Sequence, residues 1–141
     1  VQQTRVAPRR SQLTPRLGFG PEWTSMQLQD LEALVQAAVS RMSPRALRLW
    51  ELIAIPPAKW ALHPWADEDG GFWVVAVLGR HVVWYNSIED GFNTSASSAI
   101  GTIDEYWCDQ KSLEHVVYGL LHQIDTNDVP PKAGPPRALA P

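Results

Sequence analysis

The chain has 141 residues, of which 45% are apolar, enough for one domain with a buried core. No apolar run approaches the roughly 20 residues of a membrane-spanning helix, and the single cysteine, Cys108, excludes an internal disulfide, so we expect a cytoplasmic protein without a membrane segment. The net charge is −3, and residues 56–125 hold ten acidic residues against three basic ones. Such a surface repels nucleic acid and favours a basic protein as partner.

Both ends of the chain are rich in proline and lack the periodicity of a helix or a strand. Residues 1–22 are basic and are predicted to form an extended or disordered tail, and residues 126–141 form a second, proline-rich tail. A single α+β domain is expected over residues 23–125. Ordered tails need a surface to lie against, either the domain itself or a neighbouring chain, which is compatible with a homo-oligomer held by its tails.

Two helices are predicted at the start of the domain. Thr24 and Gln27 fit a capping box, and apolar residues then recur at helical spacing as far as Met42. Ser43-Pro44 begins a second helix, with serine as N-cap and proline at the first helical position. Pro56-Pro57 is predicted to end this helix, because proline lacks the N–H group that a helix needs and its ring clashes with the preceding turn.

The periodicity changes from helix to strand over residues 58–107. Phe72–Leu78 is apolar at every position, as in a strand that is covered on both faces. Gly79-Arg80 then has glycine first, as a type II′ hairpin turn prefers, and a returning strand follows over residues 82–85. The register set by this turn pairs Val75 with Trp84 and Val77 with Val82.

Two more strands and a helix are predicted towards the end of the domain. Asp90-Gly91 indicates a second hairpin with a type I′ turn, followed by a strand from Phe92. Residues 100–107 alternate between apolar and polar positions and predict a fourth, edge strand. Asp109 is the expected N-cap of a last helix, whose apolar stripe occupies residues 113–124. This order predicts an α+β fold: two N-terminal helices, an antiparallel meander of about four strands and a C-terminal helix packed on the sheet.

Several acidic and histidine residues are candidate metal ligands by residue type. Asp67-Glu68-Asp69 contains an Asp-x-Asp pair, but a calcium loop needs glycine sixth and a glutamate at its end, and here two glycines come too early. His115 and His122 lie seven residues apart on the last helix, about 10 Å along its axis, which is too far for one ion. The sequence therefore predicts no metal and no cofactor, and the three acids are interpreted as a solvated loop.

Cys108 is the candidate nucleophile of an alternative, enzymatic interpretation. It precedes a helix, whose N-terminus can lower the pKa of a thiol, but no signature of a cysteine enzyme surrounds it. A buried thiol is the favoured interpretation, and no catalytic residue is predicted. The alternative is a small hydrolase that uses Cys108, or a carboxylate, together with a histidine.

Tryptophans beside the acidic residues suggest a partner-binding surface. Trp60 and Trp65 lie in irregular chain near Asp67-Glu68-Asp69. An exposed indole flanked by carboxylates is a good anchor for a basic partner, although packing of both indoles against the end of the sheet explains them equally well. The predicted partner-binding residues are Trp60, Trp65, Asp67, Glu68, Asp69, Glu89, Asp90, Asp104 and Glu105. Strand order decides whether these residues share one face, and the sequence leaves strand order open.

Three stretches carry a resemblance to a known family, namely "IPPAKWALHPW", "GGFWVVAVLGRHVVWYNSIEDGFNTS" and "GTIDEYWCDQKSLEHVVYGLL". In the order of helices, meander and closing helix, residues 45–125 resemble the SMI1/KNR4 (SUKH) group of small bacterial proteins, whose members serve as toxin immunity proteins. The resemblance implies a non-enzymatic immunity or adaptor protein whose acidic positions face a basic partner, such as a nuclease toxin. A structural subunit held in an assembly by its tails is a further alternative.

Overall fold

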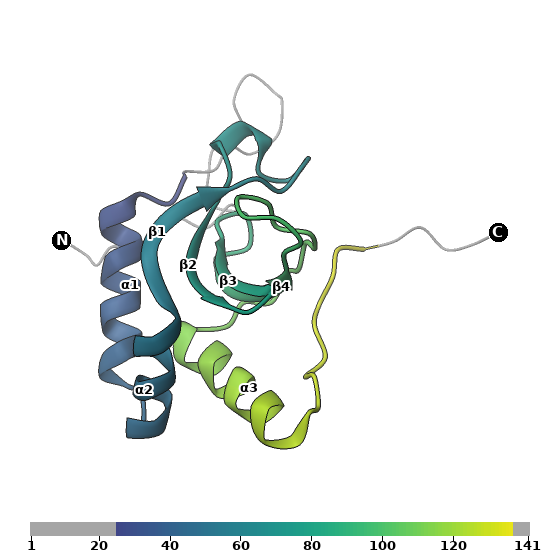
Figure 1. The fold of residues 1–141 in the computed structure, drawn as a ribbon. Coiled ribbons are helices and arrows are strands. Elements are labelled where there is room, and N and C mark those ends of the chain that lie inside the picture. The colour runs from purple at the N-terminus through teal and green to yellow at the C-terminus, as the bar shows by residue number, and fades with distance from the viewer. Residues whose placement is uncertain (1–24, 137–141) are drawn as a thin grey trace.

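Three α-helices and a four-stranded antiparallel sheet make up residues 25–136, the part of the chain that the computed structural model describes (Figure 1). The elements in chain order are α1 (Leu28–Ser40), α2 (Pro44–Ile53), β1 (Ala54–Trp60), the short 3-10 helix η2 (Asp67–Asp69), β2 (Phe72–Leu78), β3 (His81–Asn86), β4 (Gly91–Ala96) and α3 (Leu113–Thr126). The predicted α+β fold, with a meander and a C-terminal helix packed on the sheet, is confirmed. The predicted N-terminal tail, residues 1–22, and Thr24 of the predicted capping box lie outside the described residues.

The first strand of the sheet was not predicted. α2 ends at Ile53, and β1 follows directly and runs through Pro56 and Pro57, the two residues predicted to end the helix. β1 is an edge strand, and its ladder with β2 is interrupted between Ala54 and Ala58, where the two prolines lie. Proline is tolerated at such a position because no neighbouring strand needs its missing N–H group.

A β-bulge in β2 explains why half of the predicted register is wrong. Val77 pairs with Val82 as predicted, but Trp84 pairs with Val74 instead of Val75. The register shifts between Val74 and Ala76, so Val75 and Ala76 both face the helices although they are consecutive. A bulge places two residues opposite one and so breaks the simple alternation of faces.

The β3–β4 connection is longer than the predicted type I′ turn. Asn86 pairs with Gly91, so four residues connect the strands, and Asp90, not Gly91, has a positive φ, at 59°. Gly91 is required for a different reason. A Cβ atom at this position would lie 2.3 Å from Cα of Gln110 and 2.5 Å from the carbonyl oxygen of Asp109.

Apolar residues fill both faces of the sheet. One cluster lies between the sheet and helices α1, α2 and α3, and it includes Leu31, Trp50, Val75, Val83, Phe92 and Val117. The other lies on the opposite face under the irregular segments that follow β1 and β4, and it includes Trp60, Leu62, Phe72, Val74, Trp84 and Ile103. β2 contributes to both clusters, which confirms that this strand is covered on both faces.

The predicted fourth strand lies beside β4 but does not form a ladder with it. We call residues 104–111 the edge segment. The backbone-to-backbone hydrogen bonds between the edge segment and β4 lie near its two ends, where the N–H of Asp104 donates to the carbonyl of Ala96 (3.0 Å) and the N–H of Phe92 donates to the carbonyl of Lys111 (2.9 Å). These pairings make the edge segment antiparallel to β4, so it covers an edge that would otherwise be open to another strand.

Buried side chains replace the missing ladder between β4 and the edge segment. Asn93 donates from Nδ2 to the carbonyl of Asp109 (3.0 Å) and accepts the N–H of the same residue at Oδ1 (2.9 Å). Ser95 donates to the carbonyl of Glu105 (2.8 Å), and Asn86 of β3 donates to the carbonyl of Trp107 (2.9 Å). Side chains of the sheet thereby hold the edge segment along most of its length.

α3 begins at Leu113 with Ser112 as N-cap residue, so the predicted cap at Asp109 is wrong. The carboxylate of Asp109 instead accepts the N–H of Ala133 (3.0 Å). Ser43 is the N-cap of α2 as predicted, and its hydroxyl accepts the N–H of Ala46 (3.2 Å).

The close approach at Gly91 gives a test of this packing. We expect Gly91→Ala to lower the free energy of unfolding by about 2–3 kcal/mol, because its methyl group would overlap the backbone of the edge segment. Gly119→Ala is the matched control, since a Cβ there meets only the side chain of Pro130 at 3.9 Å and alanine favours the helix; it should stabilise by about 0.5–1 kcal/mol. Denaturant unfolding measures both values, and equal effects of the two substitutions would contradict the packing described.

Candidate functional site

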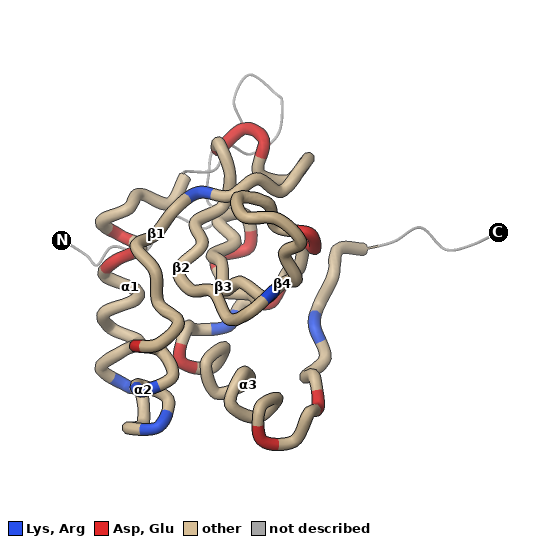
Figure 2. Tube along the Cα trace, in the orientation of Figure 1, with Lys and Arg blue, Asp and Glu red and all other residues tan. Residues whose placement is uncertain are grey.

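The acidic residues predicted to bind a partner fall into separate groups (Figure 2). One group lies near the end of the β3–β4 hairpin where Asn86 pairs with Gly91. Here the hydroxyl of Ser87 lies 3.4 Å from the carboxylate of Asp69, so η2 and the loop with Glu89 and Asp90 are neighbours.

The second group lies at the other end of the same hairpin, where His81 pairs with Ala96. Asp104 and Glu105 are bonded to Ala96, the former through its backbone and the latter through its side chain. A six-residue strand spans roughly 20 Å, so Glu89 and Asp90 lie about that far from Asp104 and Glu105 along the hairpin.

Asp69 has a structural role. Its side chain is only 6% exposed, and Lys59 lies 3.4 Å from its carboxylate and donates to its carbonyl oxygen (2.7 Å). The hydroxyl of Ser25 also donates to this carboxylate. These contacts fix η2 against β1 and against the start of α1, and they leave little of Asp69 for a partner.

The two tryptophans predicted as anchors occupy different environments. Trp60 is 8% exposed and belongs to the cluster on the face of the sheet away from the helices, so it is not a surface anchor. Trp65 is 40% exposed, and its ring stacks on that of Tyr106 with centroids 4.1 Å apart and an angle of 15° between the planes. Asp67 and Glu68 are exposed on the turn that follows Trp65. We call these four residues, Trp65, Asp67, Glu68 and Tyr106, the Trp65 surface.

Tyr106 was not among the predicted site residues. It lies in the edge segment, with Trp84 and Phe72 close to its ring as well as Trp65. Burial raises the pKa of Tyr106 to about 12, so the phenol stays neutral at physiological pH. The alternation over residues 100–107 placed Tyr106 and Trp107 on opposite faces, but nothing in the sequence pairs Tyr106 with Trp65.

Glu105 is directed inward at the other end of the hairpin. Its carboxylate accepts the backbone N–H of Ala96 (2.9 Å) and the indole N–H of Trp107 (3.3 Å). The N–H of Ala96 is the main reason that the pKa of Glu105 is lowered, with further contributions from Trp107 and from the positive charge of Lys132. Glu105 therefore acts within the domain, whereas Asp104 is exposed.

The described part of the proline-rich tail lies against the domain itself. We call residues 127–136 the arm. It is extended, and it is bonded to the edge segment by the N–H of Cys108, which donates to the carbonyl of Ala133 (2.6 Å), and by the N–H of Ala133 on Asp109. Lys132 donates to the carbonyl of Thr94 in β4 (2.9 Å).

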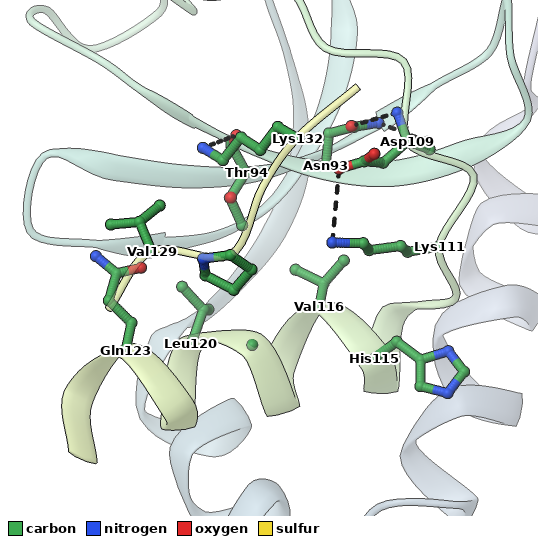
Figure 3. Close-up of a pocket in the computed structure, with 12 residues that line it drawn as sticks. Asn93, Thr94, Asp109, Lys111, His115, Val116, Leu120, Gln123, Val129 and Lys132 are labelled. Carbon is green, nitrogen blue, oxygen red and sulfur yellow. Dashed lines mark hydrogen bonds and ion pairs between the residues drawn. The ribbon is translucent and has the colours of Figure 1, made fainter. Parts of the chain in front are cut away.

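A small cavity lies between β4, α3 and the arm (Figure 3). Its volume of about 30 Å³ has room for only a few water molecules, far less than a substrate needs. The cations around it are engaged, since Lys111 lies 3.5 Å from the carboxylate of Asp109 and Lys132 bonds to Thr94. This cavity is therefore a packing feature between the arm and the domain.

The enzymatic alternative needs Cys108 or a carboxylate beside a histidine, and the structure places one such pair on the exposed turn, where the carboxylate of Asp67 lies 2.6 Å from Nδ1 of His63 and the two side chains are 51% and 83% exposed. Burial raises the pKa of the Cys108 thiol, whereas a nucleophilic cysteine needs a lowered one, and α3 begins too far along the chain to counter this. Cys108 is partly exposed, in contrast to the predicted buried thiol. Among residues 25–136, no group of three or more His, Cys, Asp or Glu side chains is arranged to hold a metal ion.

The described helices are all too short or too polar to cross a membrane. Comparison of the chain with protein-family models, with curated proteins and with solved structures gave no match.

The hydrogen bonds of Glu105 predict a pH dependence of stability. Because its pKa in the folded protein lies below the ordinary value of 4.5, the carboxylate stabilises the fold above that pH, and this contribution is lost as the pH falls through the folded value. We expect Glu105→Gln to lower the free energy of unfolding by about 1 kcal/mol near neutral pH and by much less near pH 3. Denaturant titrations at both pH values measure this. A difference that is the same at both would contradict the role given to Glu105.

Proposed function

We propose that the chain is a non-enzymatic protein-binding domain, of the immunity or adaptor kind, that docks a basic protein partner through the Trp65 surface. The observation that carries the proposal is the indole of Trp65, which is 40% exposed and held in place by its stack on Tyr106. A side chain that is already fixed loses little conformational entropy on binding, and tryptophan is enriched among the residues that dominate binding energies.

The charges beside this indole favour a basic partner. Asp67 and Glu68 are exposed two and three residues after Trp65, and Asp67 also contacts the exposed ring of His63 at 2.6 Å. Complementary charge raises the rate of association and selects the partner. A nuclease toxin fits this chemistry, because an enzyme that binds nucleic acid presents a basic surface. A protein of this kind would act in the cytoplasm, where Cys108 remains a free thiol.

The proposed surface is narrower than the set of residues predicted from sequence. Trp60 is buried, and Asp69 and Glu105 are bonded within the domain. Asp104 is exposed two residues before Tyr106, and it lies at the opposite end of the β3–β4 hairpin from Glu89 and Asp90. The proposal therefore depends on Trp65, Asp67 and Glu68, with Tyr106 as support.

Charge reversal on this turn tests the proposal. We expect the double substitution Asp67→Lys and Glu68→Lys to weaken capture of the partner at least 100-fold in a pull-down from the native cell lysate, and Trp65→Ala to weaken it at least tenfold. The matched control is Glu32→Lys with Glu51→Lys, the same charge change at two exposed positions of α1 and α2. Capture that survives the first reversal as well as it survives the control would refute the proposed surface.

A further inference from the structure

Three consecutive residues of the arm, Lys132, Ala133 and Gly134, each contact the domain. The ammonium of Lys132 donates to the carbonyl of Thr94 (2.9 Å) and lies 5.3 Å from the ring centroid of Trp107. Ala133 makes two hydrogen bonds to the edge segment, and Gly134 packs against the ring of Trp107, where a Cβ atom would lie 3.5 Å away. We call the groups that receive these residues the arm slot, which consists of Thr94, Glu105, Trp107, Cys108 and Asp109.

The arm slot has the chemistry of a lysine-binding site. An aromatic face, a carbonyl oxygen and the charges of Glu105 and Asp109 all favour an ammonium group at the position of Lys132. Burial acts in the opposite direction and lowers the pKa of Lys132, which shows that the slot removes water from this group. A shorter side chain would not reach the carbonyl of Thr94, and an uncharged one would lose the attraction to the ring of Trp107 and to the two carboxylates.

The rest of the slot recognises an extended backbone. The N–H of Cys108 and the carboxylate of Asp109 bond to the carbonyl and the N–H of Ala133, as an added strand would be bonded at the edge of a sheet. The ring of Trp107 lies against Gly134, where an added Cβ atom would be in ordinary van der Waals contact with it. The slot thus fits an extended segment with a lysine followed by a residue whose backbone N–H and carbonyl are both bonded.

The arm is bonded to the domain mainly at this slot. It leaves the end of α3 and runs back alongside the domain (Figure 1). Asn127, with a φ of 62°, turns the chain, and the residues that follow border an open hollow together with Tyr118 and His122. Val129, in this stretch, is 61% exposed. The bonds of Lys132 and Ala133 are therefore the main contacts that displacement of the arm would have to break.

We propose that the arm slot is a binding site for an extended, lysine-containing segment of the partner, and that the arm fills this site in cis until the partner replaces it. That the partner is a basic protein rests on the proposed function. That the slot binds a lysine-containing segment rests only on the contacts of the arm. Tyr106 of the Trp65 surface and Trp107 of the slot are consecutive in the edge segment, so the two surfaces lie close together along the chain. An arm tethered to its own site has an effective concentration in the millimolar range, so the partner must bring such additional contacts to compete.

A synthetic peptide of residues 127–136, NDVPPKAGPP, tests the slot directly. It would be titrated into the full chain carrying Lys132→Glu, in which the arm now places a carboxylate against Glu105 and Asp109. Binding would be followed by the NMR signals of the Cys108 amide and the Trp107 indole. We expect this chain to bind the peptide at least tenfold more tightly than the unaltered chain does, and a peptide with glutamate in place of its lysine to bind at least tenfold more weakly.

Two further variants keep this test falsifiable. Ala133→Pro removes the N–H that Asp109 accepts and should release the arm without a change of charge, whereas Arg80→Glu repeats the charge change at an exposed turn and should leave the peptide excluded. Failure of the peptide to bind either released chain, or equal binding of the two peptides, would overturn the proposal. So would a dimer of the unaltered chain that Lys132→Glu dissociates, because the occupant would then be the arm of a second copy. None of these readouts involves Asp67 or Glu68, so the slot and the Trp65 surface can fail separately.

Discussion

Three polar side chains that are almost fully buried in the sheet determine where the edge segment lies. Asn86, Asn93 and Ser95 are 0%, 2% and 0% exposed, and the structure gives each of them a hydrogen bond to a backbone group of the edge segment. A buried amide or hydroxyl without a partner costs about 1–3 kcal/mol. Any position of the edge segment that broke these bonds would therefore carry a large penalty, although the segment has no regular ladder with β4.

Both proposed binding surfaces follow from this constraint. The edge segment places Tyr106 under Trp65, and it places Trp107, Cys108 and Asp109 along the arm. The same arrangement covers the outer edge of β4, which would otherwise be open to aggregation. A single irregular segment thus closes the sheet, supports the exposed indole and forms the slot for the arm.

Local patterns in the sequence predicted the parts of the fold that depend on neighbours along the chain. The uniform apolar character of β2, the turn at Gly79 and the cap at Ser43 all predicted what the structure contains. The failures have a common cause, which is that the deciding contact comes from a distant residue. Pro56 predicts the end of a helix, but proline is also tolerated in an edge strand such as β1. Gly91 predicts a turn, but here glycine is required because the edge segment approaches it closely.

The same limit applies to the candidate site. Composition and spacing identified Trp65 and its acidic neighbours, but they also selected Trp60 and Asp69, which are engaged in the interior. Burial of these residues depends on contacts with distant parts of the chain, which no local pattern encodes. The site of Lys132 on Trp107 is likewise a pairing of residues 25 positions apart, and the lysine within a proline-rich stretch was its only sequence signal.

Amide hydrogen exchange in an Asn93→Ala variant tests most directly whether the buried side chains hold the edge segment. We expect the amides of Asp109 and Ala133 to lose protection together, because Asn93 fixes Asp109 and Asp109 fixes Ala133, while the amide of Val82 in the centre of the sheet stays protected. Unchanged protection at Asp109, or an equal loss at Val82, would show that Asn93 does not hold the edge segment.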